Sequence, residues 1–309
     1  MKIYFNRKIR RSPWGGGAHF MSAMADYLIE KGHQVVEKLE RDVNLIFMMD
    51  ARYEEEGCDV NMVKGYRILN PKVKILYRIN ECDARKGTND VDKLILESTN
   101  VASRVVFISE WLKQYFTSKG FSKESDVVYN GCNSEWFKPD LKKTELSNPI
   151  RLVTHHWSDN WMKGFDLYNA LDELVGQNTK YQFTYIGRYN KDYSPKNIKV
   201  IPPLYGADLG DELRKHDIYV TSSKFEPCGM HHIEGASSGL PVIYHKDGGA
   251  IVDMCKKHGE QFSDSASFAL ALEKITSNYS NYRSLIDYES LSMKRCCDEY
   301  YKIILDLTK

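Results

Sequence analysis

The stretch Ser222–Gly249, SSKFEPCGMHHIEGASSGLPVIYHKDGG, is the most informative part of the chain. A short apolar run, Ile218–Thr221, precedes it and is typical of a buried strand. We expect a loop around Glu226 and then a helix that begins at Gly229 or Met230. The N-terminus of a helix carries unpaired N–H groups and the positive end of the helix dipole. Strand, glycine-containing loop and helix in this order therefore predict a phosphate site.

Two glutamates, Glu226 and Glu234, flank this predicted anion site. Glu226 lies in the loop, and Glu234 follows eight residues later, more than one turn inside the helix. A carboxylate can accept hydrogen bonds from both hydroxyls of a diol, so one glutamate suits a sugar and the other a ribose. The spacing alone is a weak signal, but the glycine and proline residues around it favour a functional interpretation.

Outside this stretch, short apolar runs alternate with helical patterns along the whole chain. The expected strands are Met1–Phe5, Gln34–Val36, Leu45–Met49, Ile75–Ile79, Val105–Ile108, Val127–Tyr129, Arg151–Thr154, Phe183–Ile186, Ile218–Thr221 and Pro241–Tyr244. Strand–helix repeats predict parallel sheets covered by helices, so the expected fold class is α/β. The polar stretch Lys138–Pro149 is the expected linker. It would separate domain 1–145 from domain 146–289, with a helix at about 290–309 packing back on the first.

The composition limits the classes of partner. A length of 309 residues suggests two domains, and 43 basic against 42 acidic side chains give a net charge of +1. Near-neutrality argues against nucleic acid as a partner. No apolar run is long enough for a signal peptide or a membrane span, and the seven cysteines form no Cys-x-x-Cys pair. We therefore expect a cytoplasmic protein with reduced thiols, in which the basic run Arg7–Arg11 is a candidate peripheral membrane contact or a solvated loop.

Several motifs resemble family 4 of the retaining glycosyltransferases, whose pattern is E-P-F-G-L…E-A-x-A-x-G-x-P-V-I. The matching residues here are Glu226-Pro227-Cys228-Gly229, Glu234-Gly235-Ala236 and Gly239-Leu240-Pro241-Val242-Ile243. Further stretches agree in the same order: Trp14–Ala18, Ile108–Leu112, Val128–Cys132 with Phe137–Pro139, Lys163-Gly164 and Leu213–Thr221. The resemblance implies the GT-B fold, with two Rossmann-like domains facing each other across a cleft. It also implies transfer of a hexose from a UDP- or GDP-sugar to an acceptor hydroxyl, with retention, in glycan or polysaccharide synthesis.

The resemblance also implies roles for individual residues. Catalytic Glu226 would contact donor-sugar hydroxyls, and Lys163 would pair with the diphosphate. Glu234 would hold the ribose. The backbone at Gly229 and Met230 would contact the sugar or the diphosphate, with His231 nearby. Gly16 and Gly17, in the N-terminal domain, would approach the phosphates or the acceptor. No cofactor or metal is expected, because helix ends and basic groups neutralise the leaving diphosphate.

Two departures from the family pattern matter. The arginine that usually precedes the Lys-Gly pair is replaced by Ser158, and His155, His156 or Arg188 could substitute for it. The histidine usually found beside the transferred sugar is also missing. The matching strand end, Tyr77–Lys86, offers Arg78, Asn80 and Asp83 as acceptor or sugar contacts instead. These departures keep open a sugar-nucleotide-binding protein that has lost catalysis.

Other enzymes of the same fold, such as a nucleotide-sugar epimerase or a phosphorylase, also remain alternatives. A dinucleotide dehydrogenase is a weaker one, since Gly15–Phe20 reads Gly-Gly-Gly-Ala-His-Phe and lacks the Gly-x-Gly-x-x-Gly motif.

Overall fold

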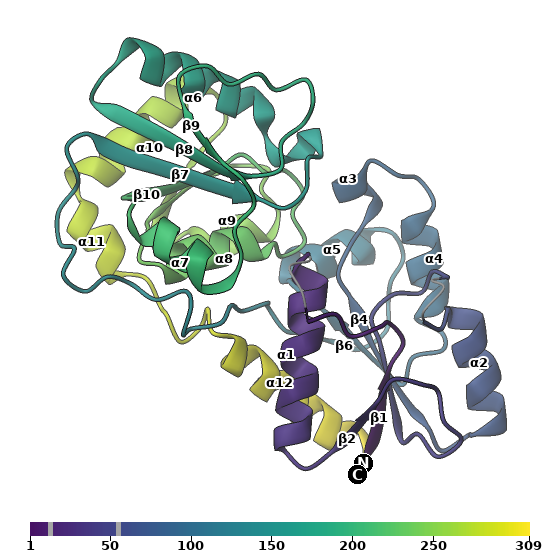
Figure 1. Ribbon diagram of the computed structural model, residues 1–309. Coiled ribbons are helices and arrows are strands. Elements are labelled where there is room, and N and C mark those ends of the chain that lie inside the picture. The colour runs from purple at the N-terminus through teal and green to yellow at the C-terminus, as the bar shows by residue number, and fades with distance from the viewer. Residues whose placement is uncertain (12–14, 54–56) are drawn as a thin grey trace. The chain divides into compact units, whose positions relative to one another are not determined.

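The computed structural model describes residues 1–11, 15–53 and 57–309, which divide into two compact units. The N-terminal unit comprises Met1–Asn130 and Met293–Lys309, and the C-terminal unit comprises Gly131–Ser292. Each unit contains one six-stranded sheet flanked by helices (Figure 1). The expected α/β class is therefore confirmed. Trp14, part of the expected glycine-rich loop, lies outside the described residues.

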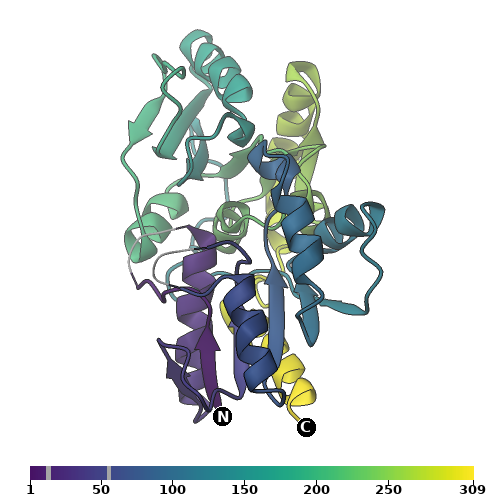
Figure 2. The same ribbon diagram turned by 90° about the vertical axis from the view of Figure 1, so that its right-hand side faces the viewer.

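The N-terminal sheet has the strand order β2-β1-β3-β4-β5-β6, and its paired strands are parallel. Its strands are β1 (Lys2–Phe5), β2 (Gln34–Val36), β3 (Leu45–Met48), β4 (Lys74–Ile79), β5 (Arg104–Phe107) and β6 (Ser125–Val127). Its helices are α1 (Gly16–Glu30), α2 (Val60–Leu69), α3 (Asp83–Lys86), α4 (Val91–Ser98), α5 (Glu110–Ser118) and α12 (Met293–Leu307). α1 and α12 lie side by side, and α2 and α4 cover the opposite face of the sheet (Figures 1 and 2).

The last helix of the chain completes the N-terminal core. α1 turns Phe20, Met24 and Leu28 inward at helical spacing, and all three are fully buried. The ring of Tyr300 in α12 packs 4.9 Å from Phe20 and 5.6 Å from Phe47, measured between ring centroids. The apolar face of α1 is thus buried by residues that are far away in the sequence.

The first turn of α1 corrects the expected loop. α1 begins at Gly16, so Gly16 and Gly17 lie in the helix and not in the loop before it. Gly15 is the N-cap residue and has no side chain with which to cap the free N–H groups. The first turn therefore presents backbone amides without a side-chain cap.

The C-terminal sheet has the strand order β12-β11-β10-β7-β8-β9, and its paired strands are also parallel. Its strands are β7 (Ile150–His156), β8 (Tyr181–Gly187), β9 (Lys199–Ile201), β10 (Ile218–Thr221), β11 (Val242–His245) and β12 (Gly259–Phe262). Its helices are the 3₁₀ turn η1 (Trp161–Lys163), α6 (Phe165–Gln177), α7 (Gly206–Arg214), α8 (Met230–Ser237), α9 (Ala250–Cys255), α10 (Ser265–Ser277) and α11 (Tyr279–Ser284). The strand order reverses between β7 and β10, and open α/β sheets bind ligands at the carboxyl ends of strands at such a point.

The C-terminal unit includes residues expected in the N-terminal domain. Trp136 packs against Tyr205 with ring centroids 5.5 Å apart, and Arg214 donates a hydrogen bond to the Trp136 carbonyl at 2.8 Å. Lys143 forms an ion pair with buried Asp217 at 2.8 Å. These contacts tie the segment before Pro149 to the second sheet, so the division lies at 130/131 and not at 145/146.

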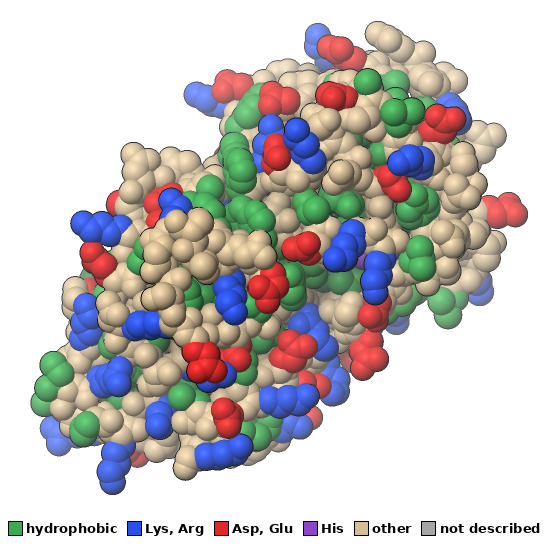
Figure 3. All heavy atoms as spheres, turned by 180° about the vertical axis from the view of Figure 1, so that it is seen from behind, with side chains coloured by type: hydrophobic (Ala, Val, Ile, Leu, Met, Phe, Trp, Pro, Cys, Tyr) green, Lys and Arg blue, Asp and Glu red, His purple; other side chains and the backbone are tan. Residues whose placement is uncertain are grey.

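Residues 285–292 connect α11 to α12. Within the described ranges, no helix is long and apolar enough to cross a membrane. Figure 3 shows one face of the molecule, on which Lys and Arg side chains are interspersed with Asp and Glu side chains.

Candidate functional site

Most of the predicted donor-site residues meet where β7 and β10 end. β7 closes with His155 and His156, and the loop after β10 carries Glu226 into the start of α8. α8 begins at Met230 with Gly229 as its N-cap, as the sequence predicts. This is the strand pair between which the sheet order reverses, so the residues lie where the fold favours a ligand.

Lys163 and Glu226 form a buried ion pair in this site. Lys163 Nζ lies 2.9 Å from Glu226 Oε2, and the two side chains are only 10% and 9% exposed. Gly164 follows the lysine with φ of 99°, and a Cβ there would lie 2.7 Å from the backbone of Ser222. Only glycine lets the chain adopt this conformation so close to the end of β10. The glycine in the Lys-Gly pair therefore positions the lysine beside the glutamate.

The loop that carries Glu226 is held at several backbone points. Phe225 has φ of 51°, a strained conformation for a residue with a bulky side chain, and its N–H donates to the Asp247 carbonyl at 2.8 Å. The Glu226 carbonyl accepts a hydrogen bond from the Ala250 N–H at 2.9 Å. Gly249 has φ of 66°, and a Cβ there would lie 2.5 Å from the Glu226 carbonyl oxygen. The Glu226 backbone is thus fixed by contacts with the segment after β11.

Glu234 faces a histidine. His155 Nε2 donates a hydrogen bond to Glu234 Oε2 at 2.7 Å, and both side chains are 9% exposed. The hydroxyl of Tyr219 lies 3.2 Å from His155 Nδ1 and 3.2 Å from His231 Nδ1. α8 packs closely against this tyrosine: a Cβ on Gly235 would lie 2.5 Å from Tyr219 Cγ. Each of the two signature glutamates therefore faces a nitrogen-bearing side chain.

His156 and His231 are buried imidazoles kept neutral by their surroundings. Burial lowers the pKa of His231 to about 4, and it lowers the pKa of His156 well below its ordinary value. The His156 ring lies 4.9 Å from the His231 ring, and its Nε2 lies 2.7 Å from the Tyr168 hydroxyl. Burial also raises the pKa of Tyr168 to about 12, so this hydroxyl stays protonated.

Arg188, the third candidate to replace the missing arginine, is exposed. Its guanidinium lies 4.3 Å from the centre of the Trp157 ring, and its backbone N–H donates to the His156 carbonyl at 3.1 Å. It therefore follows β8 directly, beside the end of β7, and its side chain is not part of the buried cluster. The described part of the chain contains no group of three or more His, Cys, Asp or Glu side chains that could hold a metal ion.

The N-terminal unit brings Arg78 and Asn80 to the first turns of α1. Arg78 is 1% exposed, and its guanidinium lies 4.1 Å from the centre of the Phe20 ring. Its Nη2 donates to Asn130 Oδ1 at 2.8 Å, while Nε and Nη1 are buried without a hydrogen-bond partner. A Cβ on Gly17 would lie 3.5 Å from Asn80 Nδ2. A buried, partly unsatisfied cation beside an uncapped helix start can bind an anion.

Asp83 has a structural task. Its carboxylate accepts hydrogen bonds from the Val91 and Asp92 N–H groups at 3.1 and 3.0 Å, at the start of α4. These bonds and the one from Thr88 lower the pKa of Asp83 although burial opposes them. The carboxylate is therefore occupied by the protein itself.

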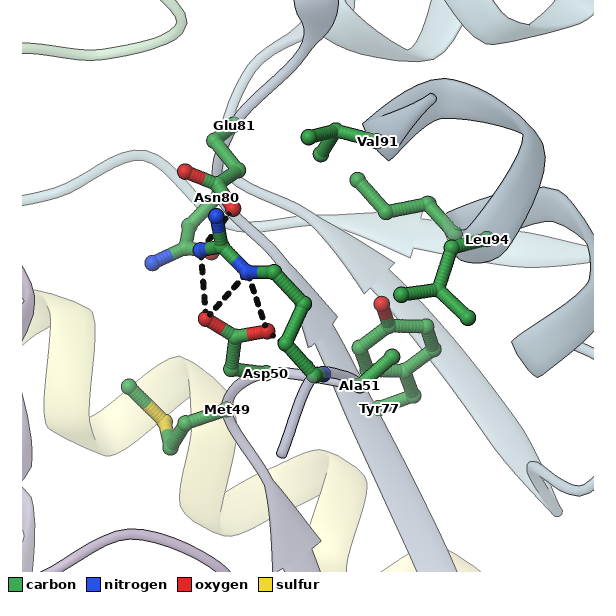
Figure 4. Close-up of a pocket in the computed structure, with 10 residues that line it drawn as sticks. Met49, Asp50, Ala51, Tyr77, Asn80, Glu81, Val91 and Leu94 are labelled. Carbon is green, nitrogen blue, oxygen red and sulfur yellow. Dashed lines mark hydrogen bonds and ion pairs between the residues drawn. The ribbon is translucent and has the colours of Figure 1, made fainter. Parts of the chain in front are cut away.

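A small pocket lined by both charged and apolar side chains lies beside Asn80, where β3 and β4 end (Figure 4). Asp50 accepts hydrogen bonds from Arg52 at 2.6 and 3.1 Å, and Arg52 also contacts Glu81. The wall opposite these charges is apolar and includes Val91 and Leu94 (Figure 4). Sequence reasoning missed Asp50, Arg52 and Glu81, although charged residues directly after two neighbouring strands are the signal that could have found them.

We compared the sequence with known protein families and proteins. Residues 154–278 match the family model described as glycosyl transferases group 1. The matched segment contains Lys163, Glu226 and Glu234. A probable sucrose-phosphate synthase of Thermosipho melanesiensis is 27% identical over 199 residues, which are 58% of this chain and 46% of that protein. The chain thus spans less than half the length of this curated relative.

Solved structures match the whole fold. Sucrose-phosphate synthase from Thermosynechococcus elongatus superposes with a TM-score of 0.73 at 12% identity, covering 99% of this chain and 98% of that one. Anabaena HepE in complex with UDP and glucose gives a TM-score of 0.73 at 15% identity, covering 99% of this chain and all of that one. These likenesses show the fold, and the expected GT-B class is confirmed.

Proposed function

We propose that the protein is a retaining glycosyltransferase of the family 4 type that moves a sugar from a nucleotide diphosphate sugar to an acceptor hydroxyl. The observation that carries the proposal is the gathering of Lys163, Glu226 and Glu234 where β7 and β10 end, beside the N-terminus of α8. The match of residues 154–278 to group 1 glycosyl transferases supports it. UDP, which is bound in the HepE structure, is the first nucleotide to test.

The donor is recognised by the two glutamates in this proposal. Glu234 accepts hydrogen bonds from the ribose and Glu226 from the donor sugar, since a carboxylate can take two hydroxyl donors together. Lys163 exchanges Glu226 for the diphosphate, whose charge it neutralises together with the amides at Gly229 and Met230. The acceptor attacks from the face that the diphosphate leaves, and a donor phosphate oxygen takes its proton. No step in this scheme needs a metal ion.

The N-terminal unit supplies the acceptor contacts in this proposal. Arg78 and Asn80 lie at the first turns of α1, and the pocket of Asp50, Arg52 and Glu81 lies beside Asn80. The mixed charges suit a polyhydroxyl acceptor, because carboxylates accept from hydroxyls while the guanidinium and the amide donate to them. Buried Arg78 adds a position for a negatively charged group of a substrate.

The rival function is a sugar-nucleotide-binding protein without catalysis, which the serine at position 158 and the exposed position of Arg188 favour. A thermal-shift panel of UDP-, GDP- and ADP-sugars tests binding, and release of nucleoside diphosphate in the presence of a mixture of sugar acceptors tests transfer. We expect stabilisation by one nucleotide class together with transfer. Stabilisation without transfer or donor hydrolysis would favour the binding protein, and no stabilisation by any nucleotide would refute the proposal.

Two variants separate the roles of the glutamates. We expect Glu234→Ala to weaken nucleotide-sugar binding by about tenfold or more, since it removes the acceptor for the ribose. We expect Glu226→Ala to lower the transfer rate much more than the affinity for the nucleotide alone. Isothermal titration with UDP and steady-state kinetics measure both effects. If both variants transferred sugar like the parent, this assignment of the site would be wrong.

A further inference from the structure

A chain of three side chains connects the two signature glutamates inside the C-terminal unit. It starts at Glu226, whose Oε2 lies 3.7 Å from His231 Nε2. It continues from His231 Nδ1 to the Tyr219 hydroxyl at 3.2 Å and from there to His155 Nδ1 at 3.2 Å. It ends with His155 Nε2 donating to Glu234 Oε2 at 2.7 Å. Every link except the first is within hydrogen-bond distance.

The long first link leaves a buried nitrogen unsatisfied. His231 is 7% exposed, and its Nε2 has no hydrogen-bond partner. Lys163 Nζ lies 2.9 Å from the same Glu226 oxygen. The glutamate is therefore paired with the lysine and is too far from His231 Nε2 for a hydrogen bond. A buried polar atom without a partner in a well-packed site calls for an explanation.

We propose that His231 takes over Glu226 from Lys163 when a diphosphate engages the lysine, and that His231 binds a proton as it does so. This inference rests on the proposed function, because it needs a diphosphate in the site. It makes His231 a positioning residue, which acts on the donor sugar through Glu226. Glu226 would then keep a cationic partner while Lys163 serves the phosphates.

The hydrogen bonds balance in the protonated state. The proton comes from solvent, and the imidazolium of His231 donates from Nε2 to Glu226 and from Nδ1 to the Tyr219 oxygen. The Tyr219 hydroxyl donates to His155 Nδ1, and His155 Nε2 continues to donate to Glu234. The Tyr219 oxygen also accepts from the His155 backbone N–H at 3.2 Å, so both its lone pairs are used. Every N–H and O–H donor of the three linking side chains then has an acceptor.

The charges around His231 favour this change when the ligand arrives. Lys163 from η1 and His155 and His156 from β7 face the ring, Tyr219 reaches it from β10, and His232 neighbours it on α8. Burial and the Lys163 charge hold the pKa of His231 down to about 4, while Glu226 raises it. A dianionic diphosphate that draws Lys163 away removes the repulsion and releases Glu226 to the histidine.

The first test needs no ligand. Lys163→Met removes the competing ammonium, so we expect the pKa of His231 to rise by at least about one pH unit. The titration of the imidazole is followed by NMR, and the signal is assigned by its loss in Lys163→Met/His231→Gln. An unchanged pKa of His231 in Lys163→Met would overturn the inference even if the proposed function were correct.

The second test uses UDP as the probe with the full-length protein. Isothermal titration in buffers of different ionisation enthalpy measures the protons bound with UDP. We expect uptake that grows as the pH falls from about 8 to about 6 in the parent, and that is lost in His231→Gln. The glutamine amide can still donate to Glu226, so His231→Gln should keep UDP affinity within about tenfold of the parent. Tyr219→Phe, which removes the acceptor for Nδ1–H, should also reduce the uptake.

His232→Gln is the matched control, since His232 is the next residue on α8 and its Nε2 faces the Met254 sulfur at 3.3 Å. It should leave proton uptake unchanged. UDP binding with equal uptake in the parent and in His231→Gln would refute the role of His231 and leave the proposed function standing. If neither UDP nor any other nucleoside diphosphate bound, both proposals would fail together.

Discussion

The buried pair of Lys163 and Glu226 sets a definite expectation for stability. Its side chains are 10% and 9% exposed and 2.9 Å apart, so loss of one partner removes the counter-ion that contacts the other buried charge. Such a loss costs about 3–5 kcal/mol. We expect about 3 kcal/mol for Lys163→Met, the low end of this range, because His231 can protonate beside Glu226. For a domain of this size the loss lowers Tm by roughly 6–12 °C.

The double variant supplies the decisive comparison. Lys163→Met/Glu226→Gln removes both charges, and we expect its unfolding free energy to return to within about 1 kcal/mol of the parent. Urea denaturation followed by circular dichroism measures all variants of the cycle. Lys199→Met is the control, because its 3.4 Å pair with Glu212 uses a lysine side chain that is 65% exposed, and it should change stability by less than about 1 kcal/mol. If both single variants were as stable as the double, the ion pair would not be a buried, coupled one.

Three further predictions concern other parts of the two units. Gly164→Ala should lower the unfolding free energy by about 1–3 kcal/mol and weaken UDP binding. The control Gly65→Ala, inside α2 with open space around it, should raise the unfolding free energy by about 0.5–1 kcal/mol. Equal effects of the two substitutions in urea denaturation would contradict the strain expected at Gly164. Burial holds the pKa of His216 and of His258 at about 4, so the unfolded chain binds more protons, and the unfolding free energy should fall as the pH falls from about 6.5 towards 4; urea midpoints that rose over this range would show the opposite sign. Arg78→Met should keep the unfolding free energy within about 1 kcal/mol of the parent, since two buried N–H groups of the guanidinium lack partners; a loss well above that in urea denaturation would make Arg78 a structural anchor through Asn130.

Two strands of the C-terminal sheet, β9 and β12, were not predicted from the sequence. Leu45–Met48 and Val242–His245 lie within or close to their expected ranges because nearly every side chain is buried. Lys199–Ile201 is short and largely exposed, and Gly259–Phe262 carries two polar residues, so neither has the pattern of a core strand. Local pattern therefore predicted the four inner strands of the C-terminal sheet and missed its two edge strands, β9 and β12.

The sequence predicted which segment forms the candidate site, but not which side chains contact each other within it. The loop and helix around Glu226 follow from residues that are close in sequence. The pairing of Glu234 with His155 and of Glu226 with Lys163 joins residues 79 and 63 positions apart, and depends on how β7 and β10 are paired. Periodicity carries no information about such register, so the partners of the glutamates became visible only in the structure.

The division of the N-terminal unit between the two ends of the chain imposes an order on synthesis. Its first 130 residues leave the ribosome with the apolar face of α1 uncovered, and Tyr300 and Ile304 arrive only after all of residues 131–292 have been made. The contiguous C-terminal unit can therefore fold before the N-terminal unit has its last helix. During that interval the exposed face of α1 is a target for chaperones and for aggregation. The core of the N-terminal unit is thus completed only when α12, the last helix to be synthesised, packs against α1.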